Sequence, residues 1–359
     1  MAVKRLAIVG TGLIGASIGL AAKRAGVAEV VGSDADEETV RVALERGAID
    51  RAVDELEADL VVVAVPVAQL PGRVRDVLAA TRDATVTDVG STKSSVVAAA
   101  GGDARFVGGH PVCGSEARGP AHANPDLFQD ATWFLTPAAQ TDARRYRTLH
   151  GFVSSLGAVP VAIEPRAHDR LMAMTSHLPH VLANVLLNHA GAARVEGHEP
   201  LAAAGGSLRD MPRVAGANPR IWVDIFLDNS DALQDALGEH RRRIEQVEDA
   251  LASGDAGFLA RWIGEAATNR RSMLADAYPD ATDLQRLRVH VPDRPGVLAG
   301  ITQALGAERI NIEDFELDHV SAERGGTLSL LVAGAAEAER AATLLEAMGY
   351  GVLVAPVEE

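Results

Sequence analysis

The first part of the chain alternates short apolar runs with longer segments of helical periodicity. The apolar runs are continuous, which is typical of strands that are covered on both faces of a parallel sheet. Strands that alternate with helices indicate a doubly wound α/β sheet of the Rossmann type, here predicted over residues 1–165. The expected strands are residues 5–9, 30–34, 60–65 and 84–88, completed in the same sheet by 106–107, 132–135 and 159–163.

The pattern changes at about Arg166, where strand-like runs end and helical periodicity continues to about Tyr278. We therefore predict an all-α domain over residues 166–280. Its long apolar faces favour an intertwined homodimer, with a monomeric bundle as the alternative. The expected helices are residues 171–190, 221–251 and 258–273.

Alternation returns after a predicted linker at residues 279–283. The order of elements is strand, helix, strand, strand, helix, strand, which is typical of a small ferredoxin-like module over residues 284–359. The expected strands are residues 287–291, 310–312, 328–332 and 351–354, and the expected helices are 297–305 and 335–348.

Composition and charge narrow the class of protein. A chain of 359 residues is too long for one core, and its 47% hydrophobic and 23% charged residues are typical of a globular protein. The net charge of −15 argues against nucleic-acid binding. It also gives no overall attraction for an anionic substrate, so local arginines would have to hold an acidic one. The single cysteine, Cys113, and the absence of a signal-like or membrane-spanning apolar run lead us to expect a cytoplasmic protein without a membrane partner.

A glycine fingerprint follows the first predicted strand directly. Gly10, Gly12 and Gly15 have the spacing that lets a pyrophosphate approach a helix N-terminus. Asp34 ends the second strand, where a carboxylate accepts hydrogen bonds from ribose hydroxyls and repels a 2′-phosphate. We therefore expect NAD rather than NADP, although Asp34 could instead cap the next helix. The remaining residues assigned to the cofactor are Leu13, Ile14, Val65, Pro66 and Ser91.

Ser91 and His110 are predicted on two successive loops at the carboxyl end of this sheet. A hydroxyl that orients an imidazole there is a candidate for general acid–base catalysis. The alternative for Ser91 is an N-cap of a helix that starts at Thr92 or Lys93, a role that can coexist with the first. The alternative for His110 is a structural loop histidine.

Two further clusters lie in the predicted helical domain. In the segment Thr175–His180, preceded by His168-Asp169, we expect His180 to contact substrate; helix packing is the alternative. Metal ligation is disfavoured because no HExxH arrangement is present and a proline lies between His177 and His180. Arg213, with Arg209 second, is the candidate partner for a substrate carboxylate, because a guanidinium donates two parallel hydrogen bonds. Either arginine could instead be an exposed helical residue.

Taken together, these residues resemble the prephenate dehydrogenase family over about residues 5–280. From Leu287 the chain resembles an ACT domain, an amino-acid-sensing module, with a signature turn at residues 293–298. The motifs that carry the first resemblance are GTGLIGASIGL, DVGSTK, GGHPVCGSE, AHDRLMAMTSHLPH and RDMPRVAGANPRIWVDIF.

The resemblance implies oxidative decarboxylation of prephenate to 4-hydroxyphenylpyruvate with NAD. It implies that His110 accepts the proton of the substrate hydroxyl, that Ser91 orients His110, and that Arg213 pairs with a carboxylate. The other implied substrate-binding residues are His180, Ser115, Glu116, Trp222 and Arg209. The ACT resemblance implies feedback by tyrosine at an interface between two such modules, with a purely structural module as the alternative. The implied regulatory residues are Asp293, Arg294, Pro295, Gly296, Val297, Asn311 and Ile312.

Three other functions are alternatives. Arogenate dehydrogenase acts on a substrate that differs from prephenate only in an amino group on the side chain, and the sequence leaves this alternative open. A β-hydroxyacid dehydrogenase is disfavoured, because that class relies on a lysine in the helical domain and residues 166–278 contain none. A non-catalytic amino-acid sensor is disfavoured by the presence of Ser91, His110 and Arg213.

Overall fold

The structure is a computed structural model that describes residues 3–113, 117–205, 208, 215–216, 218–277, 283–321 and 325–356. The chain forms two compact units, Met1–Arg241 and Arg242–Glu359. No helix in the described part is both long and apolar enough to cross a membrane.

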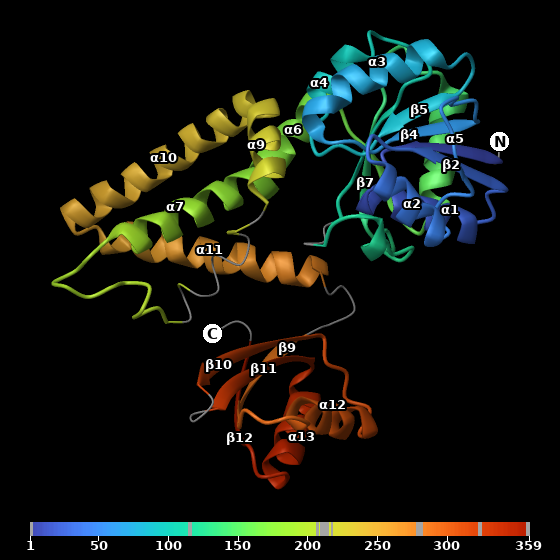
Figure 1. The fold of residues 1–359 in the computed structure, drawn as a ribbon. Coiled ribbons are helices and arrows are strands. Elements are labelled where there is room, and N and C mark those ends of the chain that lie inside the picture. Colours follow the sequence, from blue (N-terminus) through green and yellow to red (C-terminus); the bar gives the residue numbers. More distant parts are fainter. Residues whose placement is uncertain are drawn as a thin grey trace. The chain divides into compact units, whose positions relative to one another are not determined.

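A five-stranded parallel sheet forms the nucleotide-binding half of the first unit. Its strand order is β3-β2-β1-β4-β5, and helices cover both faces (Figure 1). Leu6, Ala7 and Ile8 of the central strand have no exposed surface, as the continuous apolar run predicts. The strands are β1 Arg5–Val9, β2 Glu29–Ser33, β3 Arg51–Ala52, β4 Leu60–Val63 and β5 Thr85–Asp88. The helices are α1 Leu13–Arg24, α2 Glu37–Glu45, the 3-10 turn η1 Val67–Gln69, α3 Leu70–Ala80 and α4 Ser94–Ala99.

The last three strands of this half form a second sheet, so the prediction that they complete the parallel sheet was wrong. The order is β6-β7-β8, with β6 antiparallel to β7 and β7 parallel to β8. Among the described residues, a single bridge from Phe106 to Val86 continues the first sheet. A parallel return needs a crossover, and α5 supplies one between β7 and β8. In the described part of the β6–β7 connection, the helical element is the short turn η2. The bounds are β6 Gly108–Pro111, η2 Pro120–His122, β7 Thr132–Thr136, α5 Ala143–Ser155 and β8 Val159–Ala162.

Helices follow β8, as predicted, but two of them are interrupted. The expected helix over 171–190 contains a π-helical turn, and the expected helix over 221–251 breaks at Asn229. The elements are α6 Pro165–Met172, the π turn η3 Ala173–His177, α7 Leu178–Ala192, α9 Pro219–Asp228, α10 Ser230–Ser253 and α11 Ala256–Ala277.

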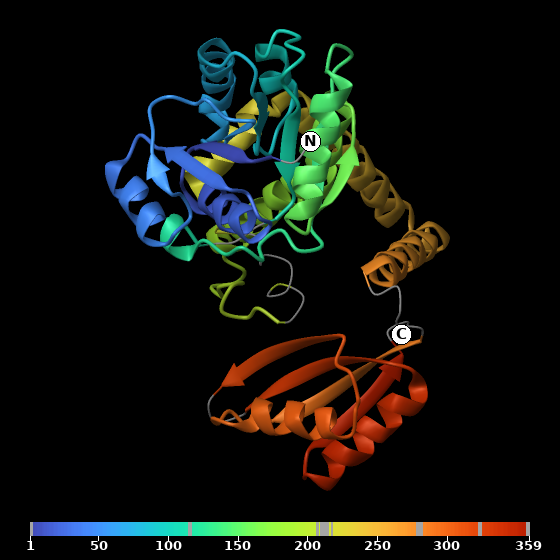
Figure 2. The same ribbon diagram turned by 90° about the vertical axis from the view of Figure 1, so that its right-hand side faces the viewer.

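The C-terminal module has the predicted βαββαβ order and a four-stranded antiparallel sheet, β10-β11-β9-β12. Figure 2 shows its two helices on one face of the sheet, where they share a core that contains Leu287, Ile301 and Leu345. The second strand starts at Asp314, later than the predicted 310–312. The bounds are β9 Leu284–Val291, α12 Val297–Ala307, β10 Asp314–Ser321, β11 Gly325–Ala333, α13 Ala335–Ala347 and β12 Gly351–Pro356.

Candidate functional site

The glycine fingerprint forms the turn between β1 and α1. Gly10 has a φ of +96°, and a Cβ at this position would lie 2.3 Å from the carbonyl oxygen of Ala64. A Cβ at Gly15 would lie 1.9 Å from the Gly10 carbonyl oxygen, so this glycine allows the helix to pack closely on the strand. A Cβ at Gly12 would meet nothing within 4 Å, which leaves open space in front of the helix that begins with Leu13 and Ile14.

Asp34 lies beside this turn. Its carboxylate accepts hydrogen bonds from the backbone N–H of Thr11 at 2.7 Å and of Asp36 at 3.1 Å. Asp36 occupies the N-cap position of α2, so the capping alternative for Asp34 does not hold. Val65, which Pro66 follows, lies next to Gly10.

These features fit a dinucleotide. Gly12 stands at the N-cap of α1 and has no side chain to cap the helix, so its first amides are available to phosphate oxygens. The Thr11 hydroxyl is buried and has no hydrogen-bond partner within the described residues. A carboxylate at the position of Asp34 can accept hydrogen bonds from ribose hydroxyls.

An enclosed ion pair between Asp88 and Lys93 fixes the turn after β5. Both side chains are fully buried. The Asp88 carboxylate accepts from the N–H of Gly90 at 2.8 Å and of Gly109 at 3.1 Å. The Lys93 ammonium donates to the Gly109 carbonyl at 2.7 Å. The pair therefore holds the DVGSTK turn against the strand that carries His110.

His110 lies on strand β6 rather than on the predicted loop, and only 9% of its surface is exposed. Its Nδ1 is 2.9 Å from Nε2 of His168, a fully buried residue of α6. The Nδ1 of His168 is in turn 2.9 Å from Oδ1 of Asp169. Two imidazoles and a carboxylate thus form a continuous chain that ends at His110.

The Asp169 carboxylate has a second role at the N-terminus of α4. It accepts hydrogen bonds from the backbone N–H of Lys93 and of Ser94, each at 2.8 Å. Helix α4 starts at Ser94, so the alternative that Ser91 caps a helix starting at Thr92 or Lys93 was wrong. His168, and not Ser91, is the partner of Nδ1 of His110. The orienting role of Ser91 stays a prediction.

Burial and hydrogen bonds set the charge states of His110, His168 and Asp169. Burial lowers the pKa of His110 well below its usual value, and the nearby His168, Lys93 and His177 lower it further. Burial also lowers the pKa of His168, although Asp169 opposes the shift. For Asp169, burial is outweighed by hydrogen bonds from His168 and Ser94, which hold its pKa below the usual range. At neutral pH both imidazoles are therefore neutral and the carboxylate is ionised.

His180 and Trp222, both predicted to contact substrate, lie together. Their rings are stacked with centroids 3.5 Å apart, and Nδ1 of His180 is 2.9 Å from the carbonyl oxygen of Ser176. The buried His177 contacts the edge of Trp222. His177 also interacts electrostatically with both His110 and His180.

Asn229 connects these histidines to the imidazole–carboxylate chain. Its side-chain nitrogen is 3.0 Å from Nδ1 of His177 and donates to the carbonyl oxygen of Asp169 at 2.8 Å. Lys93, His168, Asp169 and Asn229 were not predicted from the sequence as parts of the site. The only available signal was the His168-Asp169 pair, which was noted as a weak metal candidate. The described part of the chain contains no group of three metal-ligating side chains.

Four of the predicted substrate-binding residues, Arg213, Arg209, Ser115 and Glu116, lie outside the described residues. Their roles stay predictions.

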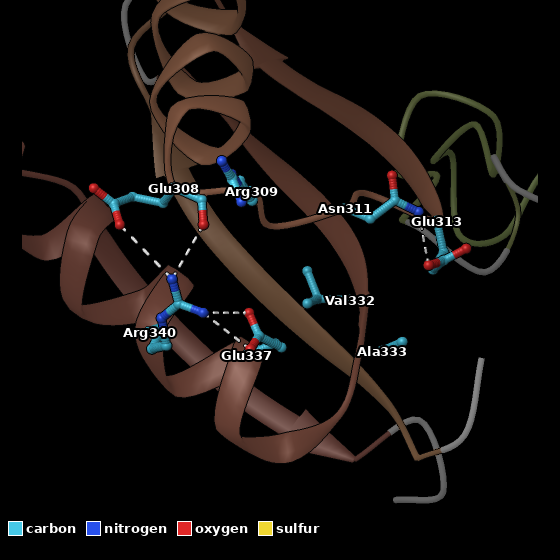
Figure 3. Close-up of a pocket in the computed structure, with 8 residues that line it drawn as sticks. All are labelled: Glu308, Arg309, Asn311, Glu313, Val332, Ala333, Glu337 and Arg340. Atoms are coloured by element: carbon cyan, nitrogen blue, oxygen red, sulfur yellow. Dashed lines mark hydrogen bonds and ion pairs between the residues drawn. The ribbon is translucent and has the colours of Figure 1, made fainter. Parts of the chain in front are cut away.

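All the predicted regulatory residues except Ile312 line one or the other of two separate cavities of the C-terminal module. The turn from Asp293 to Val297, with Arg294 and Pro295, borders a cavity of about 480 Å³, and Gly296 in it has a φ of +89°. Asn311 borders a second cavity of about 340 Å³ and donates to Glu313 at 2.8 Å, as Figure 3 shows. Arg340, on the wall of this cavity, is held by Glu337 and by the Glu308 carbonyl (Figure 3). Ile312 packs against the core.

Three family models match consecutive parts of the chain. The nucleotide-binding domain of prephenate dehydrogenase matches residues 18–162, and the dimerization domain of the same enzyme matches residues 164–265. The ACT domain matches residues 285–349.

Known proteins are similar over most of the chain. Prephenate dehydrogenase of Bacillus subtilis (strain 168) is 32% identical over 354 residues, which cover 95% of each chain. A crystal structure of prephenate dehydrogenase from Aquifex aeolicus with hydroxyphenyl propionate and NAD+ has a TM-score of 0.72 and 26% identity, and covers 76% of this chain and 99% of its own. Synechocystis arogenate dehydrogenase has a TM-score of 0.69 and 27% identity, over 75% and 99% of the two chains.

Proposed function

Because the chain belongs to the prephenate dehydrogenase family, we propose that it catalyses the NAD-dependent oxidative decarboxylation of prephenate to 4-hydroxyphenylpyruvate. The observation that supports this most directly is the series of hydrogen bonds from Asp169 through His168 to His110. It presents a buried, neutral imidazole next to the turn after β5, at the carboxyl end of the nucleotide-binding sheet.

The glycine turn and Asp34 hold the cofactor in this proposal. The amides at the start of α1 bind the pyrophosphate, and Asp34 accepts hydrogen bonds from the adenosine ribose. When bound, NAD supplies the acceptor for the hydride that leaves C4 of the substrate. The relative from Aquifex aeolicus was crystallised with NAD+.

His110 carries out the proton transfer. Its Nε2 accepts the proton of the C4 hydroxyl as the hydride leaves C4, which makes C4 a carbonyl. The bond from C1 to the ring carboxylate then breaks, carbon dioxide leaves, and the electron pair moves through the ring to the C4 oxygen. His110 returns its proton to that oxygen, so the imidazole is neutral again. Aromatisation drives the reaction, and the protein mainly positions the reactants.

The substrate side of the site is built from the helical region. His180 and Trp222 form one wall as a stacked pair. Arg213, with Arg209 second, pairs with a substrate carboxylate, and Ser115 and Glu116 border the pocket in the same proposal. Ser91 reaches toward the nicotinamide and toward His110.

A homodimer and an amino-acid ligand complete the proposal. Helices of the region matched by the dimerization-domain model expose large apolar side chains, as expected of an interface. The exposed residues include Val223 and Leu227 on α9, Ile244 and Leu251 on α10, and Trp262 and Ile263 on α11. The ACT module binds tyrosine in this proposal, and titration calorimetry of the full chain with tyrosine tests it: heat of binding is expected, and its absence contradicts the assignment.

One assay tests the function and its alternative. NADH formation is measured with prephenate and with arogenate side by side, because a relative of similar structure is named arogenate dehydrogenase. We expect turnover with prephenate, accompanied by release of carbon dioxide. Turnover with arogenate alone would transfer the assignment to arogenate, and turnover with neither would remove the proposed function.

A further inference from the structure

We propose that His168 and Asp169 are positioning residues that fix the tautomer of His110, so that its Nε2 is the unprotonated nitrogen. The inference rests on the proposed function for its kinetic consequences, but the tautomer itself is a property of the protein without substrate.

The argument starts at the carboxylate. Asp169 accepts from two backbone amides at the start of α4, and neither N–H can reverse its role. A carboxylate in this setting is ionised and acts only as an acceptor. Nδ1 of His168, 2.9 Å from its Oδ1, must therefore carry a proton and donate it.

The proton on His168 decides the next contact. A neutral imidazole carries one proton, so Nε2 of His168 has only a lone pair. The Nδ1 of His110 lies 2.9 Å away, and a hydrogen bond at this distance needs one proton between the two nitrogens. That proton must belong to His110 Nδ1. The Nε2 of His110 is then the free base that the proposed reaction needs.

The opposite tautomer is disfavoured by the surroundings. With its proton on Nε2, His110 would direct a lone pair at the lone pair of His168, inside a region where His168 has no exposed surface. A second proton on either ring would place an imidazolium close to the ammonium of Lys93, although Asp169 attracts it. His177 also opposes a charge on His110, whereas the Asp88 carboxylate favours one on His168.

The same chain supports the charged intermediate. When Nε2 of His110 accepts a proton, its Nδ1–H donates more strongly to His168, and the Asp169 carboxylate polarises His168 in turn. A Ser-His-Asp triad uses its carboxylate to hold one tautomer in a similar way, and loss of the correct tautomer there reduces kcat by about 10⁴-fold. Here a second imidazole lies between the base and the carboxylate.

The test compares two carboxylates that contact the same helix. In Asp169→Asn the side-chain amide can turn its nitrogen toward His168 and donate to it, with loss of the hydrogen bond from the Lys93 N–H. This orientation reverses the hydrogen-bonded chain and leaves the proton of His110 on Nε2. We expect kcat to fall at least ~10²-fold while KM for NAD stays within about threefold. The matched control is Asp228→Asn, because Asp228 accepts from the Ser95 hydroxyl of α4 at 2.8 Å and does not contact the imidazoles. We expect its kcat to stay near that of the wild type.

A direct measurement does not depend on the variants. Nitrogen-15 chemical shifts of labelled histidine report which ring nitrogen is protonated, and comparison with His110→Asn identifies the signals of His110. We expect a protonated Nδ1 and a free Nε2 in the wild type, and the reverse in Asp169→Asn. A wild type protonated on Nε2 would overturn the inference even if Asp169→Asn did not fold. An active wild type whose kcat and tautomer survive Asp169→Ala, which leaves no side-chain acceptor for His168, would do the same and leave the proposed function intact. An inactive wild type with the expected tautomer would contradict only the proposed function.

Discussion

Lys93 and Asp88 form an ion pair that is completely enclosed by protein, and the same lysine holds the carbonyl of Gly109, the residue before His110. Removal of one partner from such a pair leaves an uncompensated charge in the interior. We expect Lys93→Met to lower the free energy of unfolding by about 3–5 kcal/mol, measured by urea denaturation.

The control for this variant is Lys23→Met. Lys23 also pairs with an aspartate, Asp50, but both side chains are partly exposed to solvent. An exposed pair contributes about 0–1 kcal/mol. Equal losses in the two lysine variants would show that the Lys93 pair does not hold the turn.

His110→Asn tests the proposed base. The amide keeps a polar group near His168 but cannot accept the substrate proton as imidazole does. We expect kcat to fall by about 10²–10⁴-fold, with little change in the thermal midpoint. His122→Asn is the control, because this histidine is exposed. Turnover of His110→Asn near the wild-type value would remove His110 from the mechanism.

The buried His177 predicts a loss of stability in acid. Burial is the main reason that its pKa falls from 6.5 to about 4 in the folded protein. Between these pH values the unfolded chain binds a proton that the folded protein does not, so the stability contributed by neutral His177 is lost as the pH falls from 6.5 toward 4. We expect His177→Gln to have a shallower decrease of the unfolding free energy over this range. An unchanged slope would assign the acid sensitivity to other groups.

Asp34 predicts the choice of cofactor. Its carboxylate next to the glycine turn should repel the 2′-phosphate of NADP, so we expect KM for NADP to exceed KM for NAD by at least ~10-fold. Asp34→Ser should reduce this ratio. Asp36→Ser is the comparison, because Asp36 caps α2, a role that serine also fills, and this change should leave both the stability and the ratio near those of the wild type. A clear preference of the wild type for NADP would contradict the role given to Asp34.

Local patterns predicted most of the fold. Continuous apolar runs identified β1 and β4, and the change from strand to helical periodicity at about Arg166 matches the passage from β8 to α6. The antiparallel direction of β6 could not be predicted from such patterns, because an apolar run does not show whether a crossover helix precedes the next strand.

The candidate site was only partly predictable for a related reason. Individual residues such as His110, His180 and Trp222 could be selected by type and motif. The contact between His110 and His168 joins residues 58 positions apart on different elements, and no local pattern specifies it. The break at Asn229 was also missed, because an asparagine inside a helical pattern shows no sign of the two hydrogen bonds that hold it there.

The π turn at Ala173–His177 has a consequence for how this segment tolerates change. A π turn closes hydrogen bonds one residue further along the chain than an α-helix does. His168 precedes it and His180 follows it, so the angle between their side chains depends on one extra residue. Because a π turn holds one residue more than an α turn, deletion of a single residue here would restore a regular helix and leave the residues after it facing in nearly the same direction. The same deletion within α7 would rotate the residues after it by about 100°, the angle per residue of an α-helix. A one-residue change in length is therefore tolerated better at this turn than in the regular helices on either side of it.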